Sequence, residues 1–300
     1  MVNGVKYSGN NIENSKNTIN CFNVYNSENI KYSIRIGNSK DCVDTYGTIE
    51  TELIYEAVAP AFRGSNVQFS FMNQTSHDLR YSSLCSASSH LFACIGLRNK
   101  SYCILNKQYT KEQYEELVPK IIKHMNDMPY IDKKGRIYKY GEFFPSELSP
   151  FCYNETIAQE YFPLTKEQAI EQGYKWKDKE ERNYQIDIKN EDIPNDIKEV
   201  DDSIVNKVIE CEHQGKCNEQ CTEAFKIIED EYKFYKRMNL PIPHLCPNCR
   251  HYNRLKQRNP LKLWHRKCMK SGCNNEFETS YAPERPEIVY CERCYNQEVY

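Results

Sequence analysis

A six-residue rhythm of apolar and small side chains runs through the N-terminal third of the chain. The first register is mostly apolar or cysteine and resumes after one extra residue: Val24, Ile30, Ile36, Cys42, Thr48 and Ile54, then Val67, Asn73, Leu79, Cys85, Leu91, Leu97 and Cys103. The second register, three residues later, is small: Ser27, Ser33, Ser39, Thr45 and Thr51, then Ser70, Ser76, Ser82, Ser88 and Cys94. This spacing does not fit the helical period of about 3.6 residues. It predicts a β-solenoid over residues 15–107, in which stacked coils bury their apolar side chains together.

Two kinds of enzyme use comparable solenoids. Hexapeptide-repeat acyltransferases have a histidine base, for which His77 and His90 are the candidates by residue type. Their small residue follows the aliphatic one at a longer offset than the three residues seen here. Pectate-lyase-like β-helices use aspartate clusters, whereas Asp41, Asp44 and Asp78 are dispersed. We therefore assign no catalytic residue and no small-molecule substrate, and keep a hexapeptide-like acyltransferase as the third choice of function.

The middle of the chain, residues 108–202, carries the signals of an α+β cap followed by an acidic linker. Thr110 and Gln113 form a capping box, which predicts a helix that begins there and reaches about Met128. Proline inside a helix removes a hydrogen bond and clashes with the preceding turn, so Pro119 should kink or split this helix.

Three further features divide the middle segment. The stretch TKEQAIEQG at residues 165–173 has the start and stop signals of a second helix. The aromatic residues 135–162 are broken by Pro and Gly, and we expect them to lie over the end of the solenoid and protect its edge. Residues 177–202 contain ten acidic and five basic side chains, which is typical of a solvated linker.

Cysteine is the anomaly of the composition, with 15 among 300 residues. The first residues are polar and lack the features of a signal peptide, and no stretch approaches the ~20 apolar residues of a membrane span. We therefore expect a cytoplasmic protein with no membrane association, in which metal thiolate sites are favoured over disulfides. Cys42, Cys85, Cys94 and Cys103 fall on the solenoid registers and are expected to pack as small buried hydrophobes.

The C-terminal region, residues 203–300, contains two cysteine quartets with metal-ligand spacing. The predicted ligands are Cys217, Cys221, Cys246 and Cys249, then Cys268, Cys273, Cys291 and Cys294. The stretches CTEAF and CNNEF align across the two halves, which indicates a tandem duplication. Four thiolates complete a tetrahedral Zn²⁺ site without an open position, so we expect two structural zinc ions per chain. A crossed pairing stays open, and Cys211 or His213 could replace Cys217, but we rather expect Cys211 to end a preceding helix as a packed thiol.

These motifs resemble a known family. The stretch CTEAFKIIEDEYKFYKRMNLPIPHLCPNCR resembles the bacterial family of probable zinc ribbons. The ending NPLKLWHRKC…CNNEFETSYAPERPEIVYCERCYNQEVY is similar to tandem zinc-ribbon proteins of candidate-phyla bacteria. The specific likeness covers about residues 210–300. It implies small β modules stabilised by zinc, with the two quartets as ligands, and it implies no particular reaction.

A strongly basic connector joins the two quartets, although the whole chain has a formal charge of only −2. Residues 246–270 contain no acidic residue, interleave Tyr252 and Trp264, and carry eight cations: Arg250, Arg254, Lys256, Arg258, Lys262, Arg266, Lys267 and Lys270. Such a mixture can bind phosphates and stack on bases, which predicts contact with RNA or DNA. Contact with a protein partner, or pairing with the acidic residues 177–202, remains the alternative.

Overall fold

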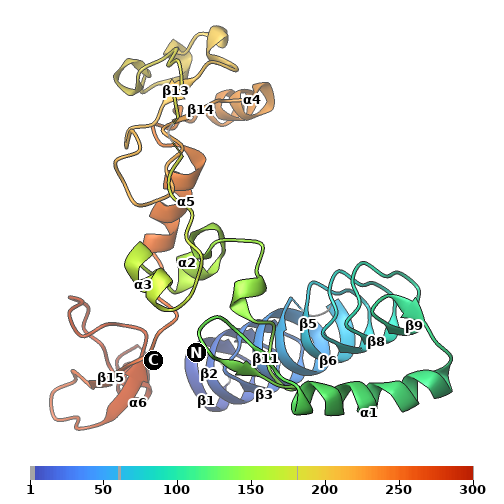
Figure 1. Cartoon of the computed structure of the whole chain (residues 1–300). Helices are drawn as coiled ribbons and strands as arrows, with labels where there is room; N and C mark the ends of the chain where they lie inside the picture. The colour runs from blue at the N-terminus through green and yellow to red at the C-terminus, as the bar shows by residue number, and fades with distance from the viewer. Residues whose placement is uncertain (1–3, 60–61, 181, 300) are drawn as a thin grey trace. The chain divides into compact units, whose positions relative to one another are not determined.

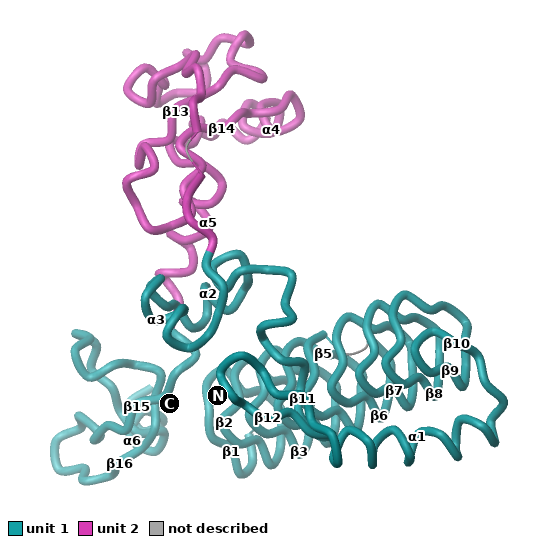
Figure 2. Tube along the Cα trace, in the orientation of Figure 1, with its two compact units in different colours: residues 1–176, 260–300 teal, residues 177–259 magenta. Residues whose placement is uncertain are grey.

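The computed structural model describes residues 4–59, 62–180 and 182–299 of the chain (Figure 1). The chain divides into two units, residues 1–176 with 260–300 and residues 177–259 (Figure 2). The domain division predicted at residues 107 and 202 stays a prediction. Among the described residues, no helix combines the length and apolar character that crossing a bilayer requires. The cytoplasmic location likewise stays a prediction.

Ten strands of the first unit wind into a β-solenoid, which confirms the predicted fold of this region. They are β1 (Val5–Glu13), β2 (Lys16–Tyr25), β3 (Glu28–Lys31), β4 (Ile34–Gly37), β5 (Lys40–Val58), β6 (Phe62–Phe71), β7 (His77–Arg80), β8 (Ser89–Phe92), β9 (Ser101–Ile104) and β10 (Lys107–Gln108). Paired strands are parallel up to β9, and β10 folds back antiparallel onto β9. Equivalent residues of successive coils lie twelve apart, as Ser27 and Ser39 do. One coil therefore contains two of the six-residue repeats.

The backbone enters the left-handed region at almost every third residue of the solenoid. In the first coils, asparagine occupies these positions, because it tolerates left-handed backbone conformations better than most residues do. These residues have φ between 46° and 58°: Asn11, Asn14, Asn17, Asn20, Asn23, Asn26 and Asn29. Side chains are buried with the same period, as at Ile12, Ser15 and Thr18. Each hexad thus contains two inward positions, one mostly apolar and one small, which explains both registers of the sequence.

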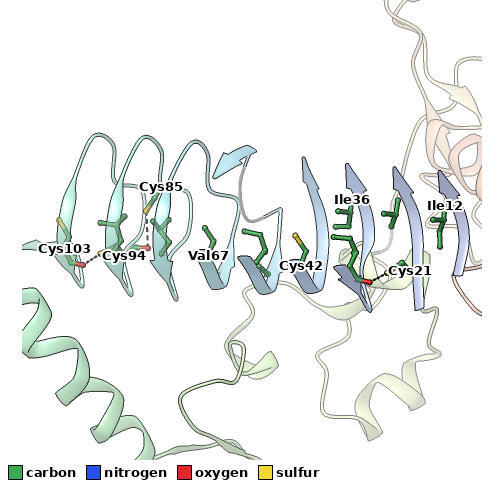
Figure 3. Packing of buried hydrophobic residues seen from close by; sticks show 14 residues of the cluster. Ile12, Cys21, Ile36, Cys42, Val67, Cys85, Cys94 and Cys103 are labelled. Carbon is green, nitrogen blue, oxygen red and sulfur yellow. Dashed lines mark hydrogen bonds between the residues drawn. The ribbon is translucent and has the colours of Figure 1, made fainter. Parts of the chain in front are cut away.

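Apolar side chains stack from coil to coil in the solenoid interior (Figure 3). Figure 3 shows Ile12, Ile36 and Val67 in this row, together with the cysteines. The predicted packing role is confirmed, because these thiols are buried in the core: Cys42, Cys85, Cys94 and Cys103. Cys21, to which the sequence assigns no role, belongs to the same core.

Buried hydroxyl groups connect the coils through hydrogen bonds. Ser70 Oγ donates to the carbonyl oxygen of Gln68 at 2.7 Å and accepts a hydrogen bond from the backbone N of Ser82 at 3.1 Å. Ser27 and Ser76 have the same two kinds of bond. Burying a hydroxyl is costly unless it is hydrogen-bonded. The small register therefore provides bonds between coils as well as space for the bend.

Helix α1 (Lys111–Asp127) follows the solenoid and has the predicted capping box of Thr110 and Gln113. Its C-cap is Met128, as the sequence predicts, and the helix continues through Pro119 without being split. Its buried residues Tyr114 and Val118 pack in a cluster with Phe92 and Ile104 of the last coils. These contacts support the helix against the side of the solenoid, where tertiary packing can outweigh the cost of an internal proline.

The aromatic segment at residues 135–162 lies against the side of the solenoid, which differs from the expected position over its end. The ring centroid of Tyr140 lies 5.7 Å from that of Phe69, and that of Phe144 lies 5.8 Å from that of Tyr81. The backbone N of Gly141 donates to Tyr81 Oη at 3.0 Å. At the C-terminal end of the solenoid the pairing edge of β9 is instead occupied by β10.

Short elements complete the middle of the chain. They are β11 (Tyr130–Ile131), β12 (Ile137–Tyr138), η1 (Ser146–Leu148), η2 (Tyr153–Glu155), α2 (Ala158–Tyr161), α3 (Lys166–Glu171), η3 (Asn190–Asp192), η4 (Ile197–Glu199) and η5 (Asp202–Ile204). Helix α3 has the predicted capping box of Thr165 and Gln168. The segment expected to be a solvated linker is partly buried, because Ile193, Ile197 and Val200 belong to the core of the second unit.

The two cysteine-rich segments have a similar order of elements, although the first contains one more helix than the second. The first contains β13 (Ile209–Glu210), β14 (Ala224–Phe225), α4 (Glu229–Met238) and α5 (Pro247–Lys256). The second contains β15 (Trp264–Lys267), β16 (Glu276–Thr279) and α6 (Glu292–Val299). In each segment an antiparallel strand pair precedes a short helix that begins at a Cys-x2-Cys pair. This agrees with the duplication predicted from the sequence.

Candidate metal centres

The second thiol cluster consists of Cys268, Cys273, Cys291 and Cys294. Cys268 directly follows β15, and Cys291 directly precedes α6, which contains Cys294. The four Sγ atoms all lie within 4.8 Å of one another, and those of Cys273 and Cys291 are 3.9 Å apart. The structure therefore brings together the four residues that the sequence predicts as the second quartet.

The first thiol cluster consists of Cys211, Cys221, Cys246 and Cys249, which are all buried. The Sγ atoms of Cys211 and Cys249 lie 4.0 Å apart, as do those of Cys221 and Cys246. Three predicted ligands are thus brought together, but Cys211 occupies the place predicted for Cys217. The reason is its position in the fold, because Cys211 directly follows a strand, β13.

Matching hydrogen bonds identify the equivalent residues of the two clusters. The backbone N of Cys246 donates to Cys211 Sγ at 3.2 Å. The backbone N of Cys291 donates to Cys268 Sγ at the same distance, 3.2 Å. Cys211 is therefore the counterpart of Cys268. A strand ends directly before Cys211 and directly before Cys268. This shared position, rather than the spacing to the next cysteine, is the signal that could have identified Cys211 as a candidate ligand.

Both clusters fit a tetrahedral metal ion. Four thiolates around Zn²⁺, with Zn–S near 2.3 Å, place their sulfur atoms about 3.8 Å apart. The measured Sγ–Sγ distances of 3.9 Å and 4.0 Å agree with this geometry. A set of four soft thiolates favours Zn²⁺ over Mg²⁺ or Ca²⁺, and it leaves no open coordination position for a substrate.

Hydrogen bonds lower the pKa of one thiol in each cluster. Burial raises the pKa of Cys246, the N-cap of α5, but hydrogen bonds from Thr222 and from the backbone of Cys249 outweigh burial and lower it to about 6. The backbone of Cys294 is the main cause that lowers the pKa of Cys291 to about 6. The thiolate is the form that binds metal, so both sulfurs are prepared for coordination near neutral pH.

Cys217 is half-buried and lies beside the first thiol cluster, with its Sγ atom 3.7 Å from that of Cys249. It belongs to a second group of potential ligands, together with His213 and Glu219. The atoms of this group that could bind a metal, including Cys249 Sγ, also lie within 4.8 Å of one another.

The basic connector does not present all eight predicted cations to solvent. Arg254, Lys256, Arg258, Lys262 and Lys267 are exposed, whereas Arg250, Arg266 and Lys270 are half-buried. Several of the eight contact polar groups of the protein, including Arg250 with Tyr235, Lys256 with Glu219, Arg266 with the carbonyl oxygen of Ala282, Lys267 with Glu276, and Lys270 with Glu298. The connector also crosses from one unit to the other at residues 259–260.

The two histidines considered for catalysis have structural neighbours. The His90 ring stacks on that of Tyr102 with a centroid distance of 4.7 Å, and its Nε2 lies 3.6 Å from Asp78 Oδ2. His77 Nδ1 forms a hydrogen bond of 2.9 Å with Ser65 Oγ. Both side chains are therefore oriented by neighbouring coils of the solenoid.

No protein-family model, curated protein or solved structure matches this chain. The functional argument therefore depends on the geometry of the two thiol clusters.

Proposed function

We propose that the chain is a zinc-binding protein in which each thiol cluster holds one structural Zn²⁺ within a zinc ribbon. The observation that carries this proposal is the grouping of four Sγ atoms within 4.8 Å in both clusters. A structural zinc ion contributes about 10–16 kcal/mol of apparent binding free energy in zinc-finger peptides, which is enough to determine whether such a segment folds. The core of the second unit includes the four thiols of the first cluster, so metal binding and packing support one another there.

Metal analysis of cysteine variants tests this proposal. Cys291→Ser removes a ligand of the second thiol cluster, and we expect the zinc content to fall by one ion per chain. Cys152→Ser is the matched control, because Cys152 is half-buried and lies outside both clusters. Equal zinc contents in the two variants, or no bound zinc in the unaltered chain, would contradict the proposal.

We further propose that the connector binds the backbone of RNA or DNA through Arg254, Arg258 and Lys262. These cations are exposed, and residues 246–270 contain no acidic residue. Lys262 Nζ lies 5.1 Å from the centre of the Trp264 ring, so a cation and an aromatic surface are adjacent. Charge and stacking together are characteristic of binding without base specificity.

The salt dependence of oligonucleotide binding tests the connector. Three contacted phosphates on a single strand predict a slope of about −2 for log K against log salt concentration. The double variant R254E/R258E should abolish binding. The variant K31E/K107E, with the same change in charge at two exposed solenoid lysines, should retain it. No binding of a generic oligonucleotide by the unaltered chain at low salt would refute this part of the proposal.

A protein–protein scaffold is the second candidate, and one observation favours it. A hollow on the solenoid is lined by exposed apolar side chains that include Ile49, Phe62, Met72 and Leu84. Contiguous exposed apolar surface is typical of a protein contact. Under this alternative, M72D/L84D should release a partner that remains bound after nuclease treatment, whereas R254E/R258E should not.

A further inference from the structure

The first thiol cluster has a longer ligand loop than the second. Nine residues separate Cys211 from Cys221, whereas four separate Cys268 from Cys273. The longer loop carries three side chains that can bind a metal: His213, Cys217 and Glu219.

These three side chains converge on a sulfur atom of the first thiol cluster. Cys249 Sγ lies 4.0 Å from Cys211 Sγ on one side and 3.7 Å from Cys217 Sγ on the other. Both distances are close to the separation of about 3.8 Å expected for two thiolates on one zinc ion. Cys249 is therefore placed to share its sulfur between two groups of four ligands.

Glu219 provides an independent indication of a ligand. It is only 7% exposed, and its Oε1 atom is paired with the ammonium of Lys256. Its Oε2 atom lies 3.3 Å from His213 Nδ1; the two form an ion pair when the imidazole is protonated, and otherwise both are buried without a hydrogen-bond partner in the described structure. Burying polar atoms in this way is costly unless something else satisfies them, and a cation between the carboxylate and the imidazole would do so.

The loop that carries these donors is held in place by the protein. Gly215 has a φ of +73°, a conformation that side chains of L-residues rarely adopt. Lys179 Nζ donates to the carbonyl oxygen of Gly215 at 3.1 Å and pairs with Glu223 at 2.7 Å. The donors are thus positioned by the fold before any ion binds.

We propose that a second zinc ion binds beside the first thiol cluster, through His213 Nδ1, Cys217 Sγ and Glu219 Oε2, with Cys249 Sγ bridging the two ions. Cysteine, histidine and glutamate are all common zinc ligands. The inference rests on the proposed zinc binding of the first thiol cluster, because Cys249 serves both ions. The whole chain would then hold three zinc ions, and the second thiol cluster, with its shorter loop, holds one of them.

Native mass spectrometry of the full chain, titrated with Zn²⁺ to saturation, tests this inference. We expect three ions in the unaltered chain, two in Cys217→Ser and three in the Cys152→Ser control. Glu219→Gln preserves the size of the side chain but removes its charge, and should weaken one ion at least tenfold against a competing chelator. A Cys217→Ser variant that loses more than one ion has lost structure, and Glu219→Gln then decides.

The outcomes separate this inference from the proposed function. Two ions in both the unaltered chain and Cys217→Ser would overturn the additional site while leaving the two thiol clusters intact. Three ions in both would also overturn it, because the third ion would then lie elsewhere. Fewer than two in the unaltered chain would contradict the proposed function itself.

Cadmium substitution tests the bridge directly. After exchange with ¹¹³Cd²⁺, two resonances of the unaltered chain should be coupled to each other through Cys249 Sγ, and the third should be uncoupled. Cys217→Ser should remove that coupling. Three uncoupled resonances would refute the shared sulfur.

Discussion

The same residue type has different surroundings in the solenoid and in the thiol clusters. In the solenoid, Cys21 Sγ donates to the carbonyl oxygen of Ile19 at 3.2 Å, and Cys85 Sγ donates to that of Ser83 at 3.3 Å. Serine hydroxyls of the small register make this same bond to the carbonyl two residues earlier. In the clusters, sulfur atoms face other sulfur atoms at 3.7–4.0 Å.

Burial alone does not distinguish the two kinds of cysteine. Cys42 of the solenoid and Cys246 of the first thiol cluster are both 0% exposed. Burial raises the pKa of Cys42 to about 11 and that of Cys211 in the first thiol cluster to about 11 as well, whereas hydrogen bonds to the Cys246 thiol outweigh burial and lower its pKa to about 6. A buried cysteine is therefore a packing residue or a candidate ligand according to the groups that face its sulfur.

Removing metal should have the largest effect and should act on the clusters alone. Each structural zinc ion is expected to contribute about 10–16 kcal/mol of apparent binding free energy, so a chelator should unfold the segments that depend on it. We expect limited proteolysis with EDTA to cleave within residues 203–300 while residues 5–104 stay protected. Equal protection of both regions would contradict the prediction that only the thiol clusters depend on metal.

A cavity in the solenoid core should have the next largest effect, and it should destabilise the solenoid rather than the thiol clusters. Leu79 is fully buried, and truncating a buried leucine to alanine costs about 2–5 kcal/mol. Leu79→Ala should lower the free energy of unfolding of the solenoid in urea without changing the zinc content. A loss of zinc in this variant would show that the solenoid and the thiol clusters fold together.

Removing one of the buried serine hydroxyls that connect the coils should have a smaller effect. Ser70→Ala removes the acceptor of the backbone N of Ser82 inside the solenoid, and leaving a buried donor unsatisfied costs about 1–3 kcal/mol. Urea unfolding measures the change. A change in the free energy of unfolding below a few tenths of a kcal/mol would mean that these hydrogen bonds between coils contribute little to stability.

Exchanging sulfur for oxygen in the solenoid should have the smallest effect. Cys94 occupies the small register, and its Sγ atom donates to the carbonyl oxygen of Phe92 at 3.4 Å, a bond that serine can also make. Cys94→Ser should change the free energy of unfolding by less than about 1 kcal/mol. The matched variant Cys294→Ser should lose a zinc ion. Similar metal loss in both would contradict the comparison between the two regions.

The regular part of the molecule could be predicted because one rule repeats along it. The period of six predicted the position of the solenoid. The one-residue insertion is also present in the structure, because Ile54 and Val67 pair across β5 and β6 although they lie thirteen residues apart instead of twelve. The cysteine pairs of the second thiol cluster were equally predictable, because short spacing brings their sulfurs together.

Predictions that depended on a particular path of the chain were less successful. The spacing favoured Cys217 as the partner of Cys221, yet the loop places Cys211 in that cluster and Cys217 next to His213 and Glu219. The acidic composition suggested a solvated linker, but Ile193 is buried in the core of the second unit. Both depend on contacts between residues that are separated in the chain, which local composition does not encode.

The sequence by itself determined the solenoid and the number of thiol clusters, because a repeated inward side chain and a repeated ligand pair are local properties. The tertiary structure decided that two hexads make one coil, since only the pairing of strands sets the length of a turn. It also decided which sulfurs meet and which of the eight connector cations remain exposed. Several residues within one loop could reach the same site, and only the folded path of that loop selects among them.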